Sequence, residues 1–444
     1  MTVKRKILVA VFAVIFIALA GAGAYLFLKQ RDIAWQKTSE SGLKARELCH
    51  FAEAEKELQV ACLNAEHFEL SDERRYSSNL ALAELYLAIG DFAKADAYID
   101  KARVSAEIQN NVQNKLKVLG LRAEAFSREA KFDDCRIAYE EMAELAKKTK
   151  ETTFEIDALF GLANLNILFL KRLAAEEIVE QIDALSMQLD EKTEYGILLS
   201  VYSAALAEQK GRYKTVLMLL EDATNVVEHR ERPSSSLELL LYNRTAAHYV
   251  LARNYVRANY IAKRVLENSD KDFDSYLAGY SLEALRTLAS AHLELNDERR
   301  ARHFIDREID EVGRRLSPAH PYYGVALQHR ALVEGREGKV DESRQDFKAA
   351  QDIFVKVFGE KNRFSADTLS DMAKLESEKN NLDSAANLCR QSLSMYKQLL
   401  PYDHPSSLKV TLLLSQIYKR QGKDVMANAL EREAGQGISA SEGK

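Results

Sequence analysis

The chain has 444 residues, of which 47% are hydrophobic and 29% are charged. Its net charge is −5 with both signs spread along the sequence, which excludes the strongly basic surface that nucleic-acid binding requires. Only five prolines occur, all after residue 232, and alternating strand-like runs are almost absent, so the composition predicts an all-α fold.

Residues 7–28 form an uncharged apolar run that is long enough, as a helix, to cross a hydrocarbon core of about 30 Å. Lys4, Arg5 and Lys6 precede this run. The cations predict a basic cytoplasmic N-terminus over residues 1–6 and a transmembrane signal anchor over residues 7–28. The prediction is therefore a single-pass membrane protein whose remaining chain is extracytoplasmic.

Two other interpretations of this segment stay open. Small residues between 18 and 24 fit a signal-peptide cleavage site, and cleavage would release a secreted or periplasmic protein. Alternatively, anchored receptors similar to those of the mitochondrial outer membrane hold their soluble part in the cytosol behind an N-terminal helix.

Segment 79–102 introduces a repeat. Its residues Ala83, Tyr86, Gly90 and Ala95 have a spacing that resembles the tetratricopeptide signature. The same spacing recurs along the chain, with the first small residue of successive units 40 to 43 residues apart. These first small residues are Gly42, Ala83, Ala123, Ala163, Ala204, Ala246, Ala289, Ala331, Ala373 and Ser415.

Two further columns accompany the first small residue. Helices approach closely only where side chains are small, so a second small residue twelve positions later predicts where paired helices cross. A bulky residue usually stands between them, nine positions after the first small one, and glycines at 90, 211, 338 and 422 predict tight turns. The second small column reads Ala54, Ala95, Cys135, Ala175, Val216, Ala258, Ala301, Ser343, Ala385 and Ala427, and the bulky column reads Phe51, Phe92, Phe132, Arg172, Tyr213, Tyr255, Glu298, Val340, Leu382 and Asp424.

The linkers of the last three repeats resemble those of the kinesin light chain type of tetratricopeptide repeat. The matching segments are SPAHPYYG at 317–324 and PYDHPSSL at 401–408, whereas the linker between them has Asn362 and Arg363 in place of His-Pro. The resemblance implies that a protein or peptide binds in a concave groove.

Together these features predict about ten tetratricopeptide-type helical hairpins over residues 32–434. One hairpin buries too little apolar surface to be stable alone, so stacking should give a right-handed superhelical solenoid with one continuous core and first helices on the concave side. Residues 435–444 are small and polar, and we expect a disordered tail there.

The sequence shows no phosphate-binding loop and no metal-ligand spacing. Cys49, Cys62, Cys135 and Cys389 lie in helical segments and are interpreted as packing residues. We therefore predict no catalytic, cofactor-binding or metal-binding residue and no enzyme activity. The predicted function is a membrane-anchored scaffold or adaptor for protein or peptide partners; an accessory regulator of an enzyme complex is the alternative.

A candidate groove follows from the first helices, where residues three before, one after and four after the small position share a face. Early repeats place Glu84 and Glu124 there, whereas later repeats are rich in amides and cations. This later face predicts binding of an acidic segment or a chain-terminal carboxylate. Solvated polar residues without a dedicated ligand are the alternative. The predicted residues are Asn243, Arg286, Gln328, Lys374, Gln416 and Lys419.

Overall fold

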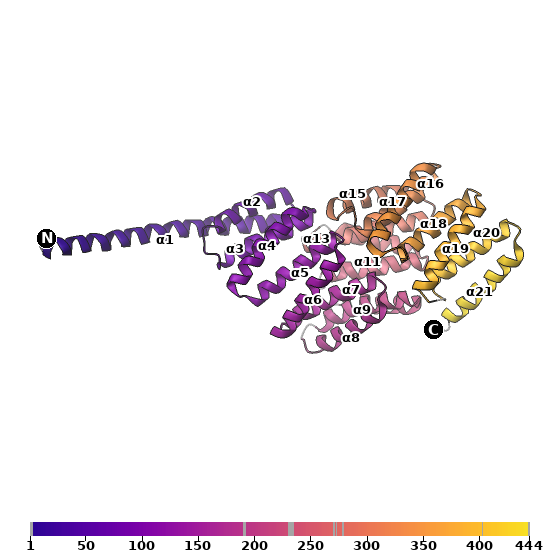
Figure 1. Ribbon diagram of the computed structural model, residues 1–444, viewed down its shortest axis with the longest axis horizontal. Helices are drawn as coiled ribbons and strands as arrows, with labels where there is room; N and C mark the ends of the chain where they lie inside the picture. Colours follow the sequence, from indigo (N-terminus) through magenta and orange to yellow (C-terminus); the bar gives the residue numbers. More distant parts are fainter. Residues whose placement is uncertain are drawn as a thin grey trace. The chain divides into compact units, whose positions relative to one another are not determined.

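The computed structural model describes residues 3–189, 192–229, 235–269, 271, 273–277, 279–401 and 403–442. Within these ranges it contains 21 α-helices and no strand, as the composition predicts (Figure 1). The chain forms two compact units, Met1–Arg122 and Ala123–Lys444, called unit 1 and unit 2 below. Each unit is described by itself.

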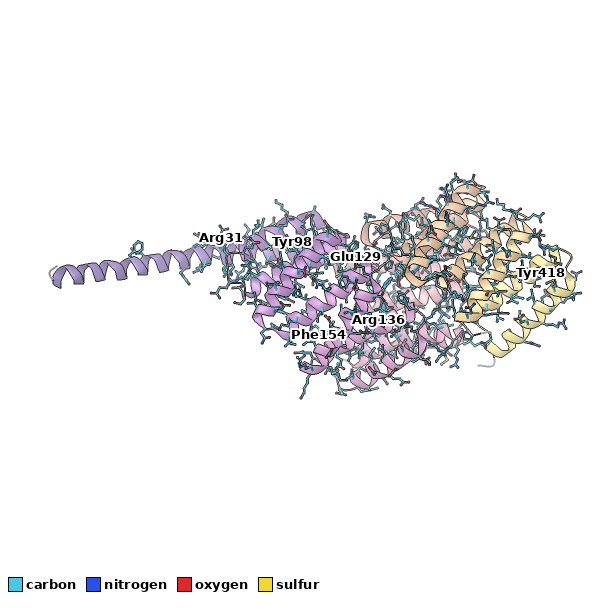
Figure 2. All side chains as sticks on the ribbon, in the orientation of Figure 1. Arg31, Tyr98, Glu129, Arg136, Phe154 and Tyr418 are labelled. Carbon is cyan, nitrogen blue, oxygen red and sulfur yellow. The ribbon has the colours of Figure 1, made fainter. Side chains whose placement is uncertain are left out.

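Unit 1 contains two hairpins and the first part of α5. Trp35 in α1 donates a hydrogen bond of 2.8 Å from Nε1 to Oγ of Ser78 in α3. In the second hairpin the ring of Tyr98, labelled in Figure 2, stacks on Tyr86 with ring centroids 5.5 Å apart. The helices are α1 (Val3–Glu47), α2 (Phe51–Ala65), α3 (Glu73–Ile89), α4 (Phe92–Gln109) and α5 (Val112–Arg128).

The prediction of a transmembrane anchor at 7–28 is wrong. Among the residues that the structure describes, none of the helices combines the length and the apolar character that crossing a membrane requires. The apolar run is not a separate element, because α1 continues without a break into a polar stretch whose end packs on α2 as the first hairpin (Figure 1). Residues 1–2, and the side chains of most residues up to 24, lie outside the described part. The predicted localisation as a single-pass membrane protein depended on this anchor and is also wrong.

Unit 2 contains eight hairpins, the first of which begins with α5. The short helix α13 lies between the sixth and seventh hairpins of the chain. The helices after α5 are α6 (Phe132–Thr149), α7 (Thr152–Leu168), α8 (Arg172–Ser186), α9 (Lys192–Gln209), α10 (Tyr213–Glu228), α11 (Ser235–Leu251), α12 (Tyr255–Asn268), α13 (Phe273–Leu277), α14 (Tyr280–Glu294), α15 (Glu298–Arg315), α16 (Pro321–Arg336), α17 (Val340–Phe358), α18 (Arg363–Glu378), α19 (Leu382–Leu399), α20 (Pro405–Arg420) and α21 (Asp424–Glu442).

The small columns predicted from the sequence lie in the core of both units. All ten first small residues are buried, and so are all ten residues of the second column. Cys135 of α6 illustrates the second column: it lies in one buried cluster with Ala123 of α5, and only 1% of the residue is exposed. The spacing of the repeats was therefore predicted correctly from Gly42 to Ala427.

Each hairpin turns at a residue with positive φ seven positions after its first small residue. Four of these residues are the predicted glycines, and Gly90, for example, has φ 82°. The other six turns use residues with a Cβ, for which this conformation is unfavourable. They are Cys49, Ala130, Leu170, Arg253, Asn296 and Asn380.

The histidines of the His-Pro linkers begin helices. His320 and His404 are the N-caps of α16 and α20, and in each case Nδ1 accepts a hydrogen bond of 3.2 Å from the backbone N–H two residues later. The prolines follow at the first helical position, where a missing N–H costs nothing. Asn362 caps α18 in the same way, accepting from the N–H of Ser365 at 2.7 Å.

First helices line the inner side of unit 2. From α9 onward each first helix packs on the next one, through α11, α14, α16, α18 and α20, while no neighbouring pair of second helices among the described residues packs to a similar extent. In a curved stack the inner helices are the ones that approach each other. The helix α21 runs to Glu442, so it extends through most of the segment for which the sequence predicts disorder.

Candidate functional site

The inner face of unit 2 carries a stripe of large polar side chains. They stand six or two residues before the small residue of a first helix, and residues four apart share one side of a helix. This stripe is called the inner face below. Its members include Tyr202, Arg244, Glu283, Asp367, Asp371 and Lys409.

One half of the inner face has a surplus of positive charge. Glu283 of α14 lies 3.6 Å from the guanidinium of Arg244 and 3.9 Å from that of Arg286. Tyr322 of α16 donates to the same carboxylate at 3.4 Å, and the Arg286 guanidinium lies over the Tyr322 ring at 4.4 Å. These four residues are called the arginine cluster. Two cations share one carboxylate in it, so one positive charge has no anionic partner within the cluster.

The arginine cluster is accessible although protein surrounds it. Burial by itself would raise the pKa of Glu283, but Arg244, Arg286 and the Tyr322 hydroxyl outweigh burial and lower it below the ordinary value. Glu283 is therefore ionised at neutral pH. The side chain of Arg244 keeps an exposed fraction of 39%, so water and small ions reach this part of the cluster.

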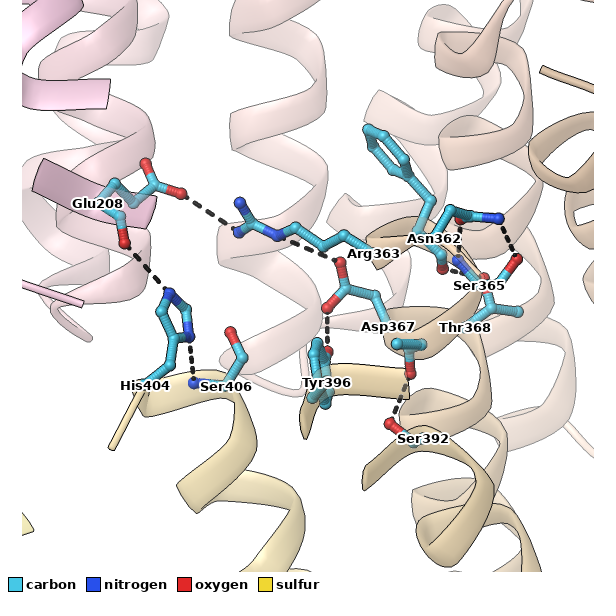
Figure 3. A network of polar contacts seen from close by, with 12 residues as sticks. Glu208, Asn362, Arg363, Ser365, Asp367, Thr368, Ser392, Tyr396, His404 and Ser406 are labelled. Carbon is cyan, nitrogen blue, oxygen red and sulfur yellow. Dashed lines mark hydrogen bonds and ion pairs between the residues drawn. The ribbon is translucent and has the colours of Figure 1, made fainter. Parts of the chain in front are cut away.

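The other half of the inner face is acidic. Arg363 of α18 lies 3.2 Å from the carboxylate of Glu208 and 3.8 Å from that of Asp367, and Tyr396 donates a hydrogen bond to Asp367 (Figure 3). Burial raises the pKa of Asp367 despite the opposing charge of Arg363. Burial also raises the pKa of Asp371, against the charge of Lys409. Carboxylates outnumber cations in this half.

Three predicted groove residues hold neighbouring first helices together. They are the residues three before the small position. Asn243 donates from its amide to the Tyr280 carbonyl at 3.0 Å, and Gln328 donates to Asp371 at 2.5 Å. Asn243 and Gln328 are buried, whereas Arg286 reaches the next first helix at Tyr322 and keeps part of its side chain exposed.

The other three predicted residues lie nearer the C-terminal end. Lys374 is half-buried, while Gln416 and Lys419 are exposed. Nζ of Lys419 lies 2.6 Å from the carboxylate of Glu431 in α21, so this cation already has an intramolecular partner.

Sequence reasoning missed Arg244, Glu283, Arg363 and Asp367. Helical periodicity defines a face but not which neighbouring face turns toward the inside of a curved stack. A usable signal was the set of large polar residues four apart in one helix, Arg363, Asp367 and Asp371, because such a stripe on a first helix is incompatible with packing on both sides.

Ser290, His329 and Glu308 form a chain of contacts that resembles a hydrolase relay. Oγ of Ser290 lies 3.2 Å from Nε2 of His329, and Nδ1 of His329 lies 3.2 Å from the buried Glu308 carboxylate. A hydrolase also needs free backbone N–H groups to bind an oxyanion. Ser290 lies inside α14, where backbone N–H groups serve the helix. We interpret these contacts as a polar link between the helices α14, α15 and α16.

Comparison with known sequence families places a match on the later repeats. Residues 322–398, which cover most of α16 to α19, match the family described as Tetratricopeptide repeat. This part of the chain, the eighth and ninth hairpins, therefore matches tetratricopeptide repeats. The kinesin light chain subtype that the His-Pro linkers suggest is not confirmed. No curated protein sequence matches the chain significantly.

Comparison with solved structures finds helical proteins at low sequence identity. A Rap protein complexed with Competence and Sporulation Factor is 13% identical, with 84% of this chain and 99% of that chain covered and a TM-score of 0.54. The apo form of the quorum sensor NprR from B. thuringiensis is 12% identical, with 82% and 99% covered and a TM-score of 0.47. The similarity to the Rap structure supports the helical-repeat fold.

Proposed function

We propose that this protein is a binding scaffold that holds a protein or peptide partner on the inner face of unit 2, and that it acts by binding rather than by catalysis. The observation that carries this proposal is the arginine cluster. Arg244 and Arg286 share a single carboxylate on an accessible face, so the cluster can accept a further anion.

The chemistry of the cluster favours an acidic segment or a chain-terminal carboxylate. Guanidinium groups bind carboxylates through paired, charge-assisted hydrogen bonds. Lys374, Gln416 and Lys419, which the sequence predicts as further contacts, lie beyond the acidic half of the inner face, so they would meet a different part of the partner from the arginine cluster. The Rap protein that shares this fold is complexed with Competence and Sporulation Factor, which agrees with a binding role for such a solenoid.

The test measures fluorescence anisotropy of labelled peptides of about fifteen residues with the full chain. A Glu-rich peptide and a Lys-rich peptide of equal length are compared at low and high salt. We expect the Glu-rich peptide to bind more tightly, and its affinity to fall with salt.

Arg244→Gln is the informative variant, because Glu283 keeps Arg286 and Tyr322 as partners. It should weaken binding of the Glu-rich peptide about tenfold, or ~1.4 kcal/mol. The matched control is Arg300→Gln on α15, which removes the same charge from a side chain that is 70% exposed. Equal affinities for the two variants, or tighter binding of the Lys-rich peptide, would contradict the proposal.

A further inference from the structure

Repeats three to five of the chain lie against repeats eight to ten. The contacts join the turns after α5, α7 and α9 to the linkers before α16, α18 and α20, and we call this set of contacts the seam. Three pairs of rings build it. The ring centroids are 6.0 Å apart in Phe132–His320, 5.1 Å in Phe169–Phe358 and 6.3 Å in Tyr213–His404.

The seam joins two sequence features that have no visible relation along the chain. Phe132 and Tyr213 belong to the bulky column, and their partners are the histidines of the two His-Pro linkers. In the middle pair both features depart from the pattern: Arg172 replaces the bulky residue, and Asn362-Arg363 replaces His-Pro. Phe169 and Phe358 supply the ring contact there instead. The departures thus occur in repeats that face each other.

Polar contacts accompany the rings. The N–H of Ser317 donates to the carbonyl of Arg128 at 3.0 Å. Because Nδ1 of His404 accepts from the N–H of Ser406, its ring proton is on Nε2, which donates to the Glu208 carbonyl at 3.1 Å (Figure 3). The Glu208 carboxylate pairs with Arg363, so one residue of α9 contacts both later linkers.

The backbones also approach closely at the seam. Gly211 has φ 72°, and a Cβ at this position would lie 2.8 Å from Cδ of Pro405. A side chain here would meet the proline ring as well as the unfavourable conformation. The glycine therefore permits both the hairpin turn and the contact with the repeat five units later.

The seam contains buried rings as well as a polar pair that water reaches. His404 and His320 are 0% and 8% exposed, whereas Glu208 and Arg363 keep exposed fractions of 29% and 25%. Ion pairs that water reaches contribute little to stability. Since first helices line the inside, the contact between repeats five units apart also closes the turn around the inner face.

We propose that the seam is a latch, which separates while the hairpins stay folded and admits an extended polypeptide segment to the inner face. The nature of the occupant rests on the proposed function. A folded domain would need a wide opening of the seam to pass through it, whereas an extended segment needs only a narrow one. Local opening of weak contacts without global unfolding is a common property of folded proteins.

Hydrogen exchange of the full chain tests the latch directly, because the Ser317 amide is protected by an acceptor across the seam. Phe169→Ala removes the middle ring pair, and we expect it to accelerate exchange at Ser317 at least tenfold. Amides inside α14 should keep their rates. The control is Leu173→Ala, in a side chain that is 74% exposed on α8. If Phe169→Ala leaves Ser317 unchanged, or accelerates α14 equally, the seam is not a separate latch.

A covalent cross-link across the seam tests whether the peptide reaches the inner face through the open seam. Arg363→Lys places an amine near the Glu208 carboxylate, and a water-soluble carbodiimide can condense the two into an amide while it is hydrated to a urea. This cross-link, located by peptide mass spectrometry, should slow association of the Glu-rich peptide at least tenfold. The control is the double variant Glu208→Gln, Arg363→Lys, which cannot form this bond.

The outcomes separate the latch from the binding role. Unchanged association after cross-linking would overturn the latch, as would equal affinity for a folded acidic domain. If the parent binds no peptide at all, the proposed function fails, while exchange at Ser317 still decides whether the seam opens.

Discussion

The hairpin stack and the seam of unit 2 are stabilised in different ways. Within the stack, small residues such as Ala258 and Ala289 have no exposed surface, and each hairpin shares its core with the next. In the seam, a few rings and polar groups meet across five repeats; both histidines are buried there, and the Glu208–Arg363 pair stays partly accessible. Many local contacts therefore determine the hairpins, whereas a few distant ones determine whether the turn is closed.

The largest predicted effect is a loss of folding stability in acid, because both seam histidines are held neutral in the folded protein. Burial and the charge of Arg363 lower the pKa of His404 to about 4, although Glu208 opposes them. Burial and the charge of Arg128 lower that of His320 to about 3. The unfolded chain binds these protons near pH 6.5 and the folded chain does not, so stability is present above ~6.5 and is lost as the pH falls.

Between pH 7 and pH 5, each histidine should therefore cost about 2 kcal/mol of folding free energy. His404→Asn keeps an N-cap, as Asn362 does in the neighbouring linker, but removes the titration. We expect this variant to lose about 2 kcal/mol less than the parent in urea unfolding over that range. His229→Asn, at an exposed site, is the control. An unchanged pH dependence for His404→Asn would show that this histidine is not held neutral.

The stack itself should respond to overpacking. Ala258→Leu inserts three carbons where α12 crosses α11, and we expect a loss of about 1–3 kcal/mol, seen as a lower unfolding midpoint. The matched control is Val256→Leu on the same helix, because Val256 is 80% exposed. Similar midpoints for the parent and Ala258→Leu would argue that the crossing is looser than the structure shows.

The smallest effect is expected at a turn. Arg253 has φ 58° at the position that Gly211 occupies in the preceding repeat, and its side chain is exposed. Arg253→Gly relieves the unfavourable conformation but adds freedom to the unfolded chain, so we expect a net gain of about 0.5–1 kcal/mol. Gly338→Ala, at the same position two hairpins after Arg253, should lose stability. A destabilised Arg253→Gly would mean that the Arg253 side chain makes a stabilising contact.

The sequence predicts what depends on neighbours along the chain. Ala83 and Ala95 are enough to define one hairpin and its crossing, because both requirements arise within forty residues. The first helix shows the limit: residues 7–28 were interpreted alone, although the helix that contains them continues to Glu47 and packs on α2.

The residues of the candidate site are set by the curvature of the stack, which cannot be predicted from the sequence of a single repeat. The polar residues at Asn243 and Gln328 were assigned to an open face, but curvature brings the next first helix against them. The same curvature brings Arg244 and Glu283 to the inner face. It also brings Phe132 to His320. This pairing could be predicted from the sequence only if the superhelical pitch were already known.

Closure also limits how the length of this protein can change. An open solenoid can gain or lose a whole repeat, because every unit meets only its two neighbours. Here the removal of one hairpin between Tyr213 and His320 would shift all three later linkers relative to the three earlier turns, and all three ring pairs would lose their partners together. The number of repeats between the two sides of the seam is therefore fixed by geometry, while repeats outside that interval are free to vary.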